Sequence, residues 1–143
     1  MPVRSASAVW EGDLMGGKGT MKLSSGAYEG AYSFASRFQD GKGTNPEELI
    51  GAAHAGCFSM AFSNTLAKAG FVPKRVATTA KVSLDKVGDG FKITTVELVT
   101  EGVVPGIDKA KFQELAEAAK KGCPVSQALS AIAINLKATL ASS

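Results

Sequence analysis

The hydrophobic pattern of the chain is dominated by a helix predicted within residues 43–70, and in its middle, at residues 49–62, apolar or small residues point in every direction around the axis. Residues 49–62 carry no charged Asp, Glu, Lys or Arg. Asn45 is a good N-cap, Pro46 suits the first helical position, and Gly70 suits a left-handed exit. Because a helix that is apolar all round is a buried one, the pattern predicts a central helix enclosed by the rest of the chain or by a second copy.

Alternation of apolar and polar residues predicts strands on both sides of this helix. The predicted strands are residues 5–11, 20–26, 31–38, 76–84, 91–101 and 132–140. Within the fifth strand the apolar parity shifts between Ile93 and Val96, which indicates a bulge or burial of both faces. The glycines at positions 16–19 are expected to supply the positive φ angles of the first hairpin turn.

A second, amphipathic helix is predicted between Asp108, its N-cap, and Gly122, its end. Its apolar face comprises Phe112, Leu115, Ala116 and Ala119. The Cys123–Pro124 pair follows, and Pro124 suits the start of a short helix. Strands and helices in this order predict a single α+β domain spanning residues 1–143.

Composition narrows the class of protein. A hydrophobic content of 45% and a charged content of 20% are typical of a soluble globular protein. A net charge of +3 is too balanced to favour nucleic acid or an anionic membrane as a partner. The central apolar stretch is shorter than the ~20 residues that span a bilayer, and no secretory signal is visible. We therefore expect a cytoplasmic protein whose 2 cysteines are free or redox-active.

The candidate reactive residues have ordinary interpretations when each is taken alone. Free cysteines such as Cys57 usually act as small buried hydrophobes, whereas Gly-Cys-Pro places Cys123 in a turn that we expect to be accessible. His54 lies three residues before Cys57, about 60° around a helix and ~4.5 Å along it. Such a pair could form a hydrolase dyad or bind a metal, but no oxyanion loop is evident and zinc needs more ligands. A packed, hydrogen-bonded role for His54 is favoured.

Arg37 is a further candidate because few charged residues are near it in the sequence. It can be an ordinary surface arginine at the end of a strand. If its guanidinium is partly buried, however, it needs a carboxylate partner. The adjacent Glu47 and Glu48 are the nearest supply along the chain.

Several segments together resemble the OsmC/Ohr family (osmotically inducible protein C and organic hydroperoxide resistance protein), and most closely its OsmC branch. These segments are NPEELIGAAHAGCFSMA, SRF, VSLDKVGDGF, VPGID and KKGCPVSQAL, and the similarity covers nearly the whole chain. The resemblance implies an α+β fold with antiparallel strands wrapped around a long buried helix in an intertwined homodimer. It also implies a thiol-dependent peroxidase that reduces organic hydroperoxides.

Matched by position, Cys57 resembles the family's peroxidatic cysteine and Cys123 its resolving cysteine. Arg37 matches the arginine that stabilises the thiolate, and Glu47 matches the carboxylate that orients this arginine. The implied cycle passes through a Cys57 sulfenic acid and a Cys57–Cys123 disulfide. An external dithiol, which the family suggests is of the lipoyl type, then reduces the disulfide. His54 lies inside the match without a catalytic assignment.

The residue types suit this chemistry without a metal or another cofactor. A permanent cation favours the thiolate, and each tenfold gain in thiolate is worth ~1.4 kcal/mol. Apolar side chains, expected to be Phe34, Phe38 and Phe58, favour an organic hydroperoxide over hydrogen peroxide. The runner-up function is a non-catalytic redox-sensing or small-molecule-binding module that uses the same pocket. A Cys-His hydrolase is the third candidate function.

The spacing of Glu47 and Cys57 along the chain predicts that two copies of the chain associate. These residues are ten positions apart on one predicted helix, which separates them by about 15 Å along a straight axis. A glutamate side chain does not span that distance. We therefore expect a homodimer in which the partner subunit's carboxylate serves each cysteine.

Overall fold

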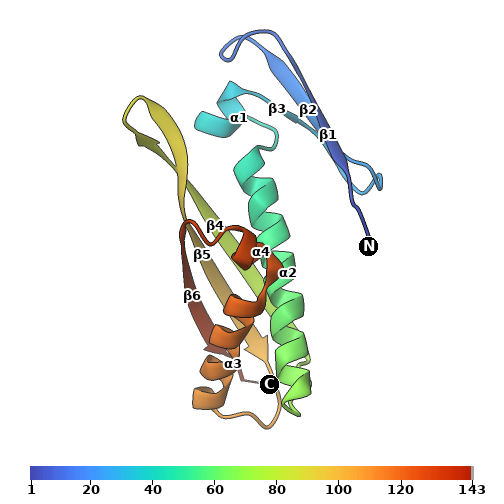
Figure 1. Cartoon of the computed structure of the whole chain (residues 1–143), viewed down its shortest axis with the longest axis vertical. Helices are drawn as coiled ribbons and strands as arrows, with labels where there is room; N and C mark the ends of the chain where they lie inside the picture. The colour runs from blue at the N-terminus through green and yellow to red at the C-terminus, as the bar shows by residue number, and fades with distance from the viewer. Residues whose placement is uncertain (143) are drawn as a thin grey trace. The chain divides into compact units, whose positions relative to one another are not determined.

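The computed structural model describes residues 1–142, which form two compact units. The first comprises Met1–Leu49, and the second begins at Ile50. Helix α2 (Pro46–Lys68) begins in the first unit and continues in the second (Figure 1). Strands and helices occur in both units, which confirms the α+β class. The expectation of one domain over residues 1–143 stays a prediction.

The first unit contains an antiparallel sheet followed by a short helix. Its elements are β1 (Ala6–Glu11), β2 (Lys18–Leu23), β3 (Glu29–Tyr32) and α1 (Phe34–Phe38). Gly19 pairs with both Trp10 and Tyr32, and a Cβ atom at this position would collide with the rings of these two residues. The glycine is therefore required by close packing. The positive φ of the first hairpin lies at Gly12 (99°), outside residues 16–19, so our expectation for the turn was wrong.

The prediction of one strand over residues 31–38 is also wrong, because the chain turns into a helix after Tyr32. Ser33 and Ser36 form a reciprocal capping box. The Ser36 N–H donates to Ser33 Oγ at 3.1 Å, and the Ser33 N–H donates to Ser36 Oγ at 2.8 Å. Phe34 and Phe38 lie one helical turn apart, with ring centroids 4.9 Å from each other. This short distance fits a helix, in which residues four apart are neighbours, whereas in a strand they lie about 13 Å apart.

The second unit contains a sheet with the order β4-β5-β6. Its strands are β4 (Arg75–Val87), β5 (Gly90–Val103) and β6 (Ala133–Leu140). Strands β4 and β5 are antiparallel, with a register shift between Ser83 and Leu84. Their partners are Thr95 and Ile93, so Thr94 is the extra residue of the predicted bulge.

Strand β6 pairs with β5 in parallel, which corrects the expectation of antiparallel strands throughout. A parallel pair needs a crossover connection. Here the connection contains α3 (Lys109–Gly122) and α4 (Pro124–Ala128). The predicted cap of α3 is confirmed, since Asp108 Oδ1 accepts a hydrogen bond from the Lys111 N–H at 2.7 Å.

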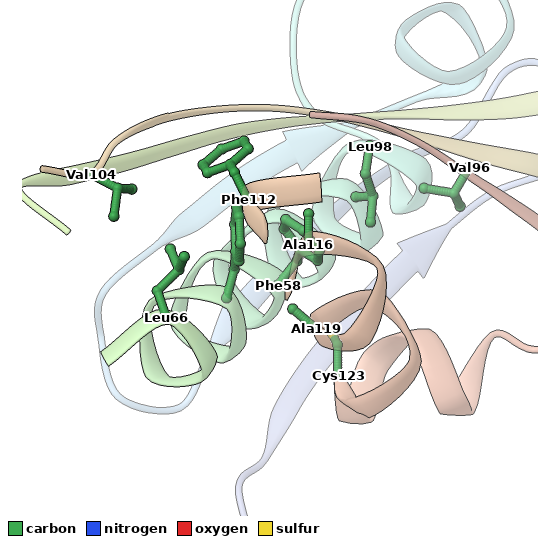
Figure 2. Packing of buried hydrophobic residues seen from close by; sticks show 10 residues of the cluster. Phe58, Leu66, Val96, Leu98, Val104, Phe112, Ala116, Ala119 and Cys123 are labelled. Atoms are coloured by element: carbon green, nitrogen blue, oxygen red, sulfur yellow. The ribbon is translucent and has the colours of Figure 1, made fainter. Parts of the chain in front are cut away.

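The core of the second unit lies between its sheet and helices α2 and α3 (Figure 2). Phe58, Phe62 and Leu66 follow one another at four-residue spacing on α2 and are completely buried. The Phe62 ring meets the ring of Phe112 on α3 edge-on, with centroids 5.1 Å apart. Buried apolar area of this kind stabilises the fold by ~25 cal/mol per Å².

The opposite face of α2 is exposed in a single chain. It presents small or apolar residues, namely Ala52, Ala53, Gly56 and Met60, and Met60 is 77% exposed. Burial of α2 on all sides therefore stays a prediction that requires a second copy. Across residues 1–142, no helix is both long and apolar enough to span a membrane.

Candidate active site

The two cysteines lie side by side in the second unit. Cys57 is on α2, and Cys123 is at the junction of α3 and α4. Both are free thiols, and their Sγ atoms are 3.1 Å apart although 66 positions separate them in the sequence. Disulfide bonds have an S–S length of about 2.05 Å, so a small movement would join the two sulfur atoms.

Cys123 is fully buried, which corrects the expectation that it is accessible. The Cys123 N–H donates to the Ala119 carbonyl at 2.9 Å and thereby ends α3. Pro124 then begins α4, as its fixed φ predicts. The turn between the helices points inward, and Figure 2 shows Cys123 beside Ala119 at the edge of the core. Cys57 is only partly buried and is the more accessible thiol.

The surroundings of the two thiols shift their pKa values in opposite directions. Burial raises the pKa of Cys57, the Val125 N–H offsets part of this effect, and the hydrogen bond with Cys123 and the charge of Cys123 raise the pKa further. Burial also opposes ionisation of Cys123. The backbone N–H of Ser126, the Cys57 thiol, the Ser126 hydroxyl and the Val125 N–H outweigh this effect and lower the pKa of Cys123.

His54 and Ser126 form a second buried pair next to the thiols. His54 Nε2 and Ser126 Oγ are 2.7 Å apart, and these residues are 0% and 5% exposed. Burial lowers the pKa of His54. The expectation of a packed, hydrogen-bonded histidine is confirmed. Ser126 was not among the predicted residues, although its position three residues after Cys123 mirrors that of His54 three residues before Cys57.

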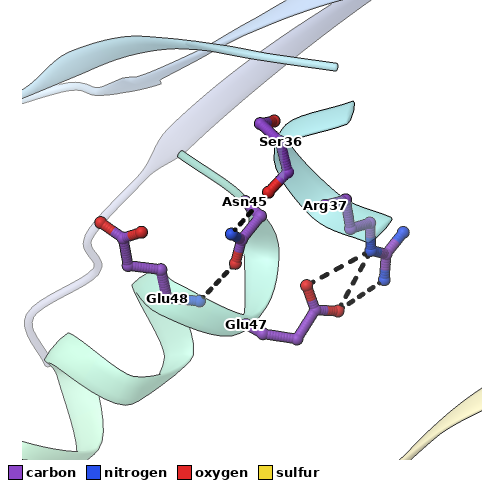
Figure 3. A network of polar contacts seen from close by, with 5 residues as sticks. All are labelled: Ser36, Arg37, Asn45, Glu47 and Glu48. Carbon is purple, nitrogen blue, oxygen red and sulfur yellow. Dashed lines mark hydrogen bonds and ion pairs between the residues drawn. The ribbon is translucent and has the colours of Figure 1, made fainter. Parts of the chain in front are cut away.

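The first unit holds an ion pair between Arg37 on α1 and Glu47 in the first turn of α2 (Figure 3). Arg37 Nη2 lies 2.7 Å from Glu47 Oε1, and Arg37 Nε donates to the two carboxylate oxygens at 3.1 and 3.3 Å. The Glu47 side chain is 9% exposed and that of Arg37 is 36% exposed. This bidentate geometry fixes the plane of the guanidinium.

The capping of α2 supports this ion pair. Asn45 Oδ1 accepts a hydrogen bond from the Glu48 N–H at 2.7 Å, and Asn45 Nδ2 donates to the Ser36 carbonyl at 3.0 Å. The cap therefore links the start of α2 to α1. Because of this link, Glu47 and Arg37 are held at the ends of two mutually anchored helices (Figure 3).

A pocket in the first unit has a volume of about 250 Å³ and an aromatic lining. Its lining residues are Trp10, Leu14, Tyr32, Ser33, Phe34, Arg37 and Phe38. The Arg37 guanidinium carbon lies 5.4 Å from the centroid of the Phe38 ring, within the range of a cation–π contact. The pocket thus combines a cation with apolar walls.

Phe58, which we expected among the side chains that favour an organic hydroperoxide, lies in the hydrophobic core of the second unit. It is 0% exposed, and its ring centroid is 5.6 Å from that of Phe62 in the core. Phe58 directly follows Cys57, but a helix turns about 100° per residue, so the two side chains leave α2 in different directions. We therefore assign Phe58 to the core.

The chain is similar to proteins of one family along most of its length. Residues 39–137 match the family model of the OsmC-like proteins. Over 129 residues, which cover 90% of both chains, the sequence is 55% identical to the peroxiredoxin OsmC of Escherichia coli. Over 89 residues, 62% of this chain and 61% of the relative, it is 39% identical to an organic hydroperoxide resistance protein of Xanthomonas axonopodis pv. citri.

The fold is also similar to solved structures. The crystal structure of the organic hydroperoxide resistance protein OhrB of Bacillus subtilis superposes with a TM-score of 0.71 at 29% identity. The similarity covers 96% of this chain and 98% of that chain. The likeness extends through both compact units of the present chain.

Proposed function

The chain belongs to the OsmC-like protein family, and on this basis we propose that it is a thiol-dependent peroxidase that reduces organic hydroperoxides to alcohols. The names of the relatives, a peroxiredoxin and organic hydroperoxide resistance proteins, support this proposal. The observation that carries it is the 3.1 Å separation of Cys57 Sγ and Cys123 Sγ. A pair of thiols so placed can take up two electrons' worth of oxidation as a disulfide.

The proposed cycle begins at Cys57. Its thiolate attacks one oxygen of the hydroperoxide, so an S–O bond forms, the O–O bond breaks, and the departing alkoxide takes a proton to become the alcohol. Cys123 then attacks the sulfur of the resulting sulfenic acid, which forms the disulfide and releases water. An external dithiol reduces the disulfide by thiol–disulfide exchange and returns both cysteines to thiols.

The burial of the two thiols supports this order of events. Cys57 is partly exposed and Cys123 is fully buried, so a peroxide reaches Cys57 first. The short distance between the sulfur atoms then favours rapid closure of the disulfide over further oxidation of Cys57. Cys57 is therefore assigned as the peroxidatic and Cys123 as the resolving cysteine.

Arg37 is proposed to ionise Cys57. Because burial raises the pKa of Cys57, a nearby permanent cation is needed to populate its thiolate at neutral pH. Arg37 is fixed by Glu47 and lines a pocket with Phe34 and Phe38, whose rings suit the organic part of a hydroperoxide. We propose a homodimer in which the partner subunit supplies this ion pair, in keeping with the ten-residue spacing of Glu47 and Cys57 on α2.

Replacement of each cysteine tests the cycle. We expect Cys57→Ser to abolish dithiol-driven turnover of cumene hydroperoxide. Cys123→Ser should still react once per chain and then accumulate a sulfenic acid that dimedone traps. The measurements are consumption of peroxide under a dithiol such as dihydrolipoamide and the mass of the dimedone adduct.

Normal turnover by Cys57→Ser would rule the proposal out. Slow disulfide formation in the unsubstituted chain without catalytic cycling would instead support a redox-sensing module. The same assay with several thiol reductants identifies the class of dithiol that completes the cycle.

A further inference from the structure

We propose that His54 and Ser126 are positioning residues that hold Cys123 as the reacting thiolate, both when the disulfide closes and when it opens. The inference rests on the proposed peroxidase function and adds two residues to it. Neither residue belongs to the thiol pair or to the arginine–glutamate pair. The inference is based on the arrangement of four side chains in the second unit.

The four side chains form two matched pairs between α2 and the α3–α4 turn. His54 and Cys57 are three residues apart on α2, and Cys123 and Ser126 are three residues apart across the first turn of α4. The Sγ atoms of Cys57 and Cys123 are 3.1 Å apart, and His54 Nε2 and Ser126 Oγ are 2.7 Å apart. The Ser126 hydroxyl also acts on Cys123, where it favours the ionised sulfur. The His54–Ser126 and Cys57–Cys123 contacts are thus joined through the first turn of α4, in which Cys123 is the N-cap and Ser126 lies three positions later.

The direction of the hydrogen bonds follows from the surroundings of the ring. His54 is completely buried, and its burial lowers its pKa, so the neutral ring is favoured. Nδ1 is buried without a hydrogen-bond partner within residues 1–142. Orphaned buried N–H groups are rarer than under-satisfied acceptors, so the proton is assigned to Nε2. His54 then donates to Ser126 Oγ, which leaves the Ser126 O–H free to donate to Cys123.

A hydroxyl held in this way has consequences for two steps. In closure, the Cys123 thiolate attacks the Cys57 sulfenic sulfur, an S–S bond forms, and the S–O bond breaks. The hydroxide that leaves takes up the proton that Cys123 has lost and becomes water. In opening, an external thiolate attacks the more accessible Cys57 sulfur and forms a mixed disulfide with it, the Cys57–Cys123 bond breaks, and Cys123 leaves as the thiolate. A lower pKa of Cys123 assists its departure.

Matched pairs of substitutions at His54 and at Ser126 test the proposed positioning role. Ser126→Ala removes the hydroxyl and Ser126→Thr retains it. His54→Leu removes the ring donor and His54→Gln retains an N–H at the place of Nε2. For each variant we would measure three rates at one pH: formation of sulfenic acid with cumene hydroperoxide, closure of the disulfide, and opening of the disulfide by dithiothreitol.

We expect Ser126→Ala and His54→Leu to slow closure and opening alike, each by about tenfold, because a charge-assisted hydrogen bond is lost. Formation of the sulfenic acid should not slow, because that step occurs at Cys57 and a less ionised Cys123 raises the pKa of Cys57 less. Ser126→Thr and His54→Gln should restore both slowed rates to within about threefold.

The two slowed steps separate this role from a structural one. A variant that merely displaced Cys123 would close slowly but would open at an unchanged or higher rate, since strained disulfides are more easily reduced. That result, or failure of both conservative variants to restore the rates, would overturn the proposal. If the unsubstituted chain forms no sulfenic acid, the peroxidase function fails instead. In that case the disulfide can be made with diamide, and the rate at which dithiothreitol opens it still tests the role of His54 and Ser126.

Discussion

At the scale of single residues, burial raises the pKa of both neighbouring thiols, and their hydrogen bonds make the net shifts differ in direction. Cys57 and Cys123 are both removed from water, yet hydrogen bonds from the α3–α4 turn lower the pKa of Cys123 while that of Cys57 is raised. The turn contributes the N–H and hydroxyl of Ser126 and the Val125 N–H to Cys123, and to Cys57 it contributes the Val125 N–H alone. The peroxidatic cysteine must obtain its stabilisation from a cation, which is the role proposed for Arg37.

Arg37→Ala tests this role when it is made in a Cys123→Ser background, where Cys57 is the remaining thiol. Loss of the cation should raise the pKa of Cys57, so the pH profile of iodoacetamide alkylation should move to higher pH by about one unit or more. Arg37→Lys, which keeps the charge but loses the bidentate contact with Glu47, should show a smaller shift. An identical profile in all three chains would remove Arg37 from the mechanism.

Residue types and spacing marked Cys57, Cys123 and Arg37 only as candidates with ordinary alternatives, and the resemblance to the OsmC/Ohr family supplied their roles. For the arginine's partner, spacing offered Glu47 or Glu48, between which the structure selects Glu47. Ser126 was missed because the residues around it in the sequence do not indicate that its turn packs against α2. That information depends on the crossover that returns the chain through α3 and α4 to the thiols.

At the scale of elements, the clearest predictions came from signals that act locally. The caps of α2 and α3 and the bulge in β5 were found because they depend on a few adjacent residues. The helix α1 was missed because its five residues alternate like a strand, and the decisive signal is the capping box of Ser33 and Ser36. The parallel pairing of β6 depends on long-range topology that alternation cannot reveal.

Ser36 is predicted to be the residue that holds α1 and its arginine in place. Its Oγ accepts from the Ser33 N–H at 2.8 Å and donates to the Thr44 carbonyl at 2.7 Å, and the residue is 6% exposed. Ser36→Ala should lower the free energy of unfolding by about 1–2 kcal/mol, because these buried groups lose their partner. Urea denaturation measures this change.

Ser25→Ala provides the matched control for this prediction. Ser25 is exposed, and its hydroxyl accepts one long hydrogen bond, from the Ala27 N–H at 3.3 Å. Its replacement should change the free energy of unfolding by less than about 0.5 kcal/mol. Equal effects of the two substitutions would show that the capping box does not anchor α1.

At the scale of the whole molecule, the exposed face of α2 favours a dimer. Gly56 lies on this face, and a Cβ atom added there would meet no atom of the same chain within 4 Å apart from its chain neighbours and the nearby backbone of its own helix. Gly56→Glu should therefore leave the fold of one chain intact, all the more because glutamate favours a helix over glycine. A charge at a buried interface would, however, prevent association. Analytical ultracentrifugation should show dimers of the unsubstituted chain and monomers of the variant.

Ala118→Glu is the control for the dimer prediction, because Ala118 lies on the exposed face of α3. This variant should remain dimeric and active. An unsubstituted chain that is monomeric at micromolar concentration and turns over hydroperoxide at full rate would contradict the dimer. It would also contradict the proposal that a partner subunit supplies Arg37 and Glu47.

The central claim is that Cys57 and Cys123 of one chain become a disulfide during peroxide reduction. Its most direct test is the intact mass of the chain under non-reducing conditions after one equivalent of cumene hydroperoxide, followed by peptide mapping. The proposed mechanism predicts loss of two hydrogen atoms per chain and one linked peptide that contains Cys57 and Cys123. An unchanged mass, a disulfide between chains, or stable addition of oxygen to Cys57 with Cys123 still reduced would contradict it.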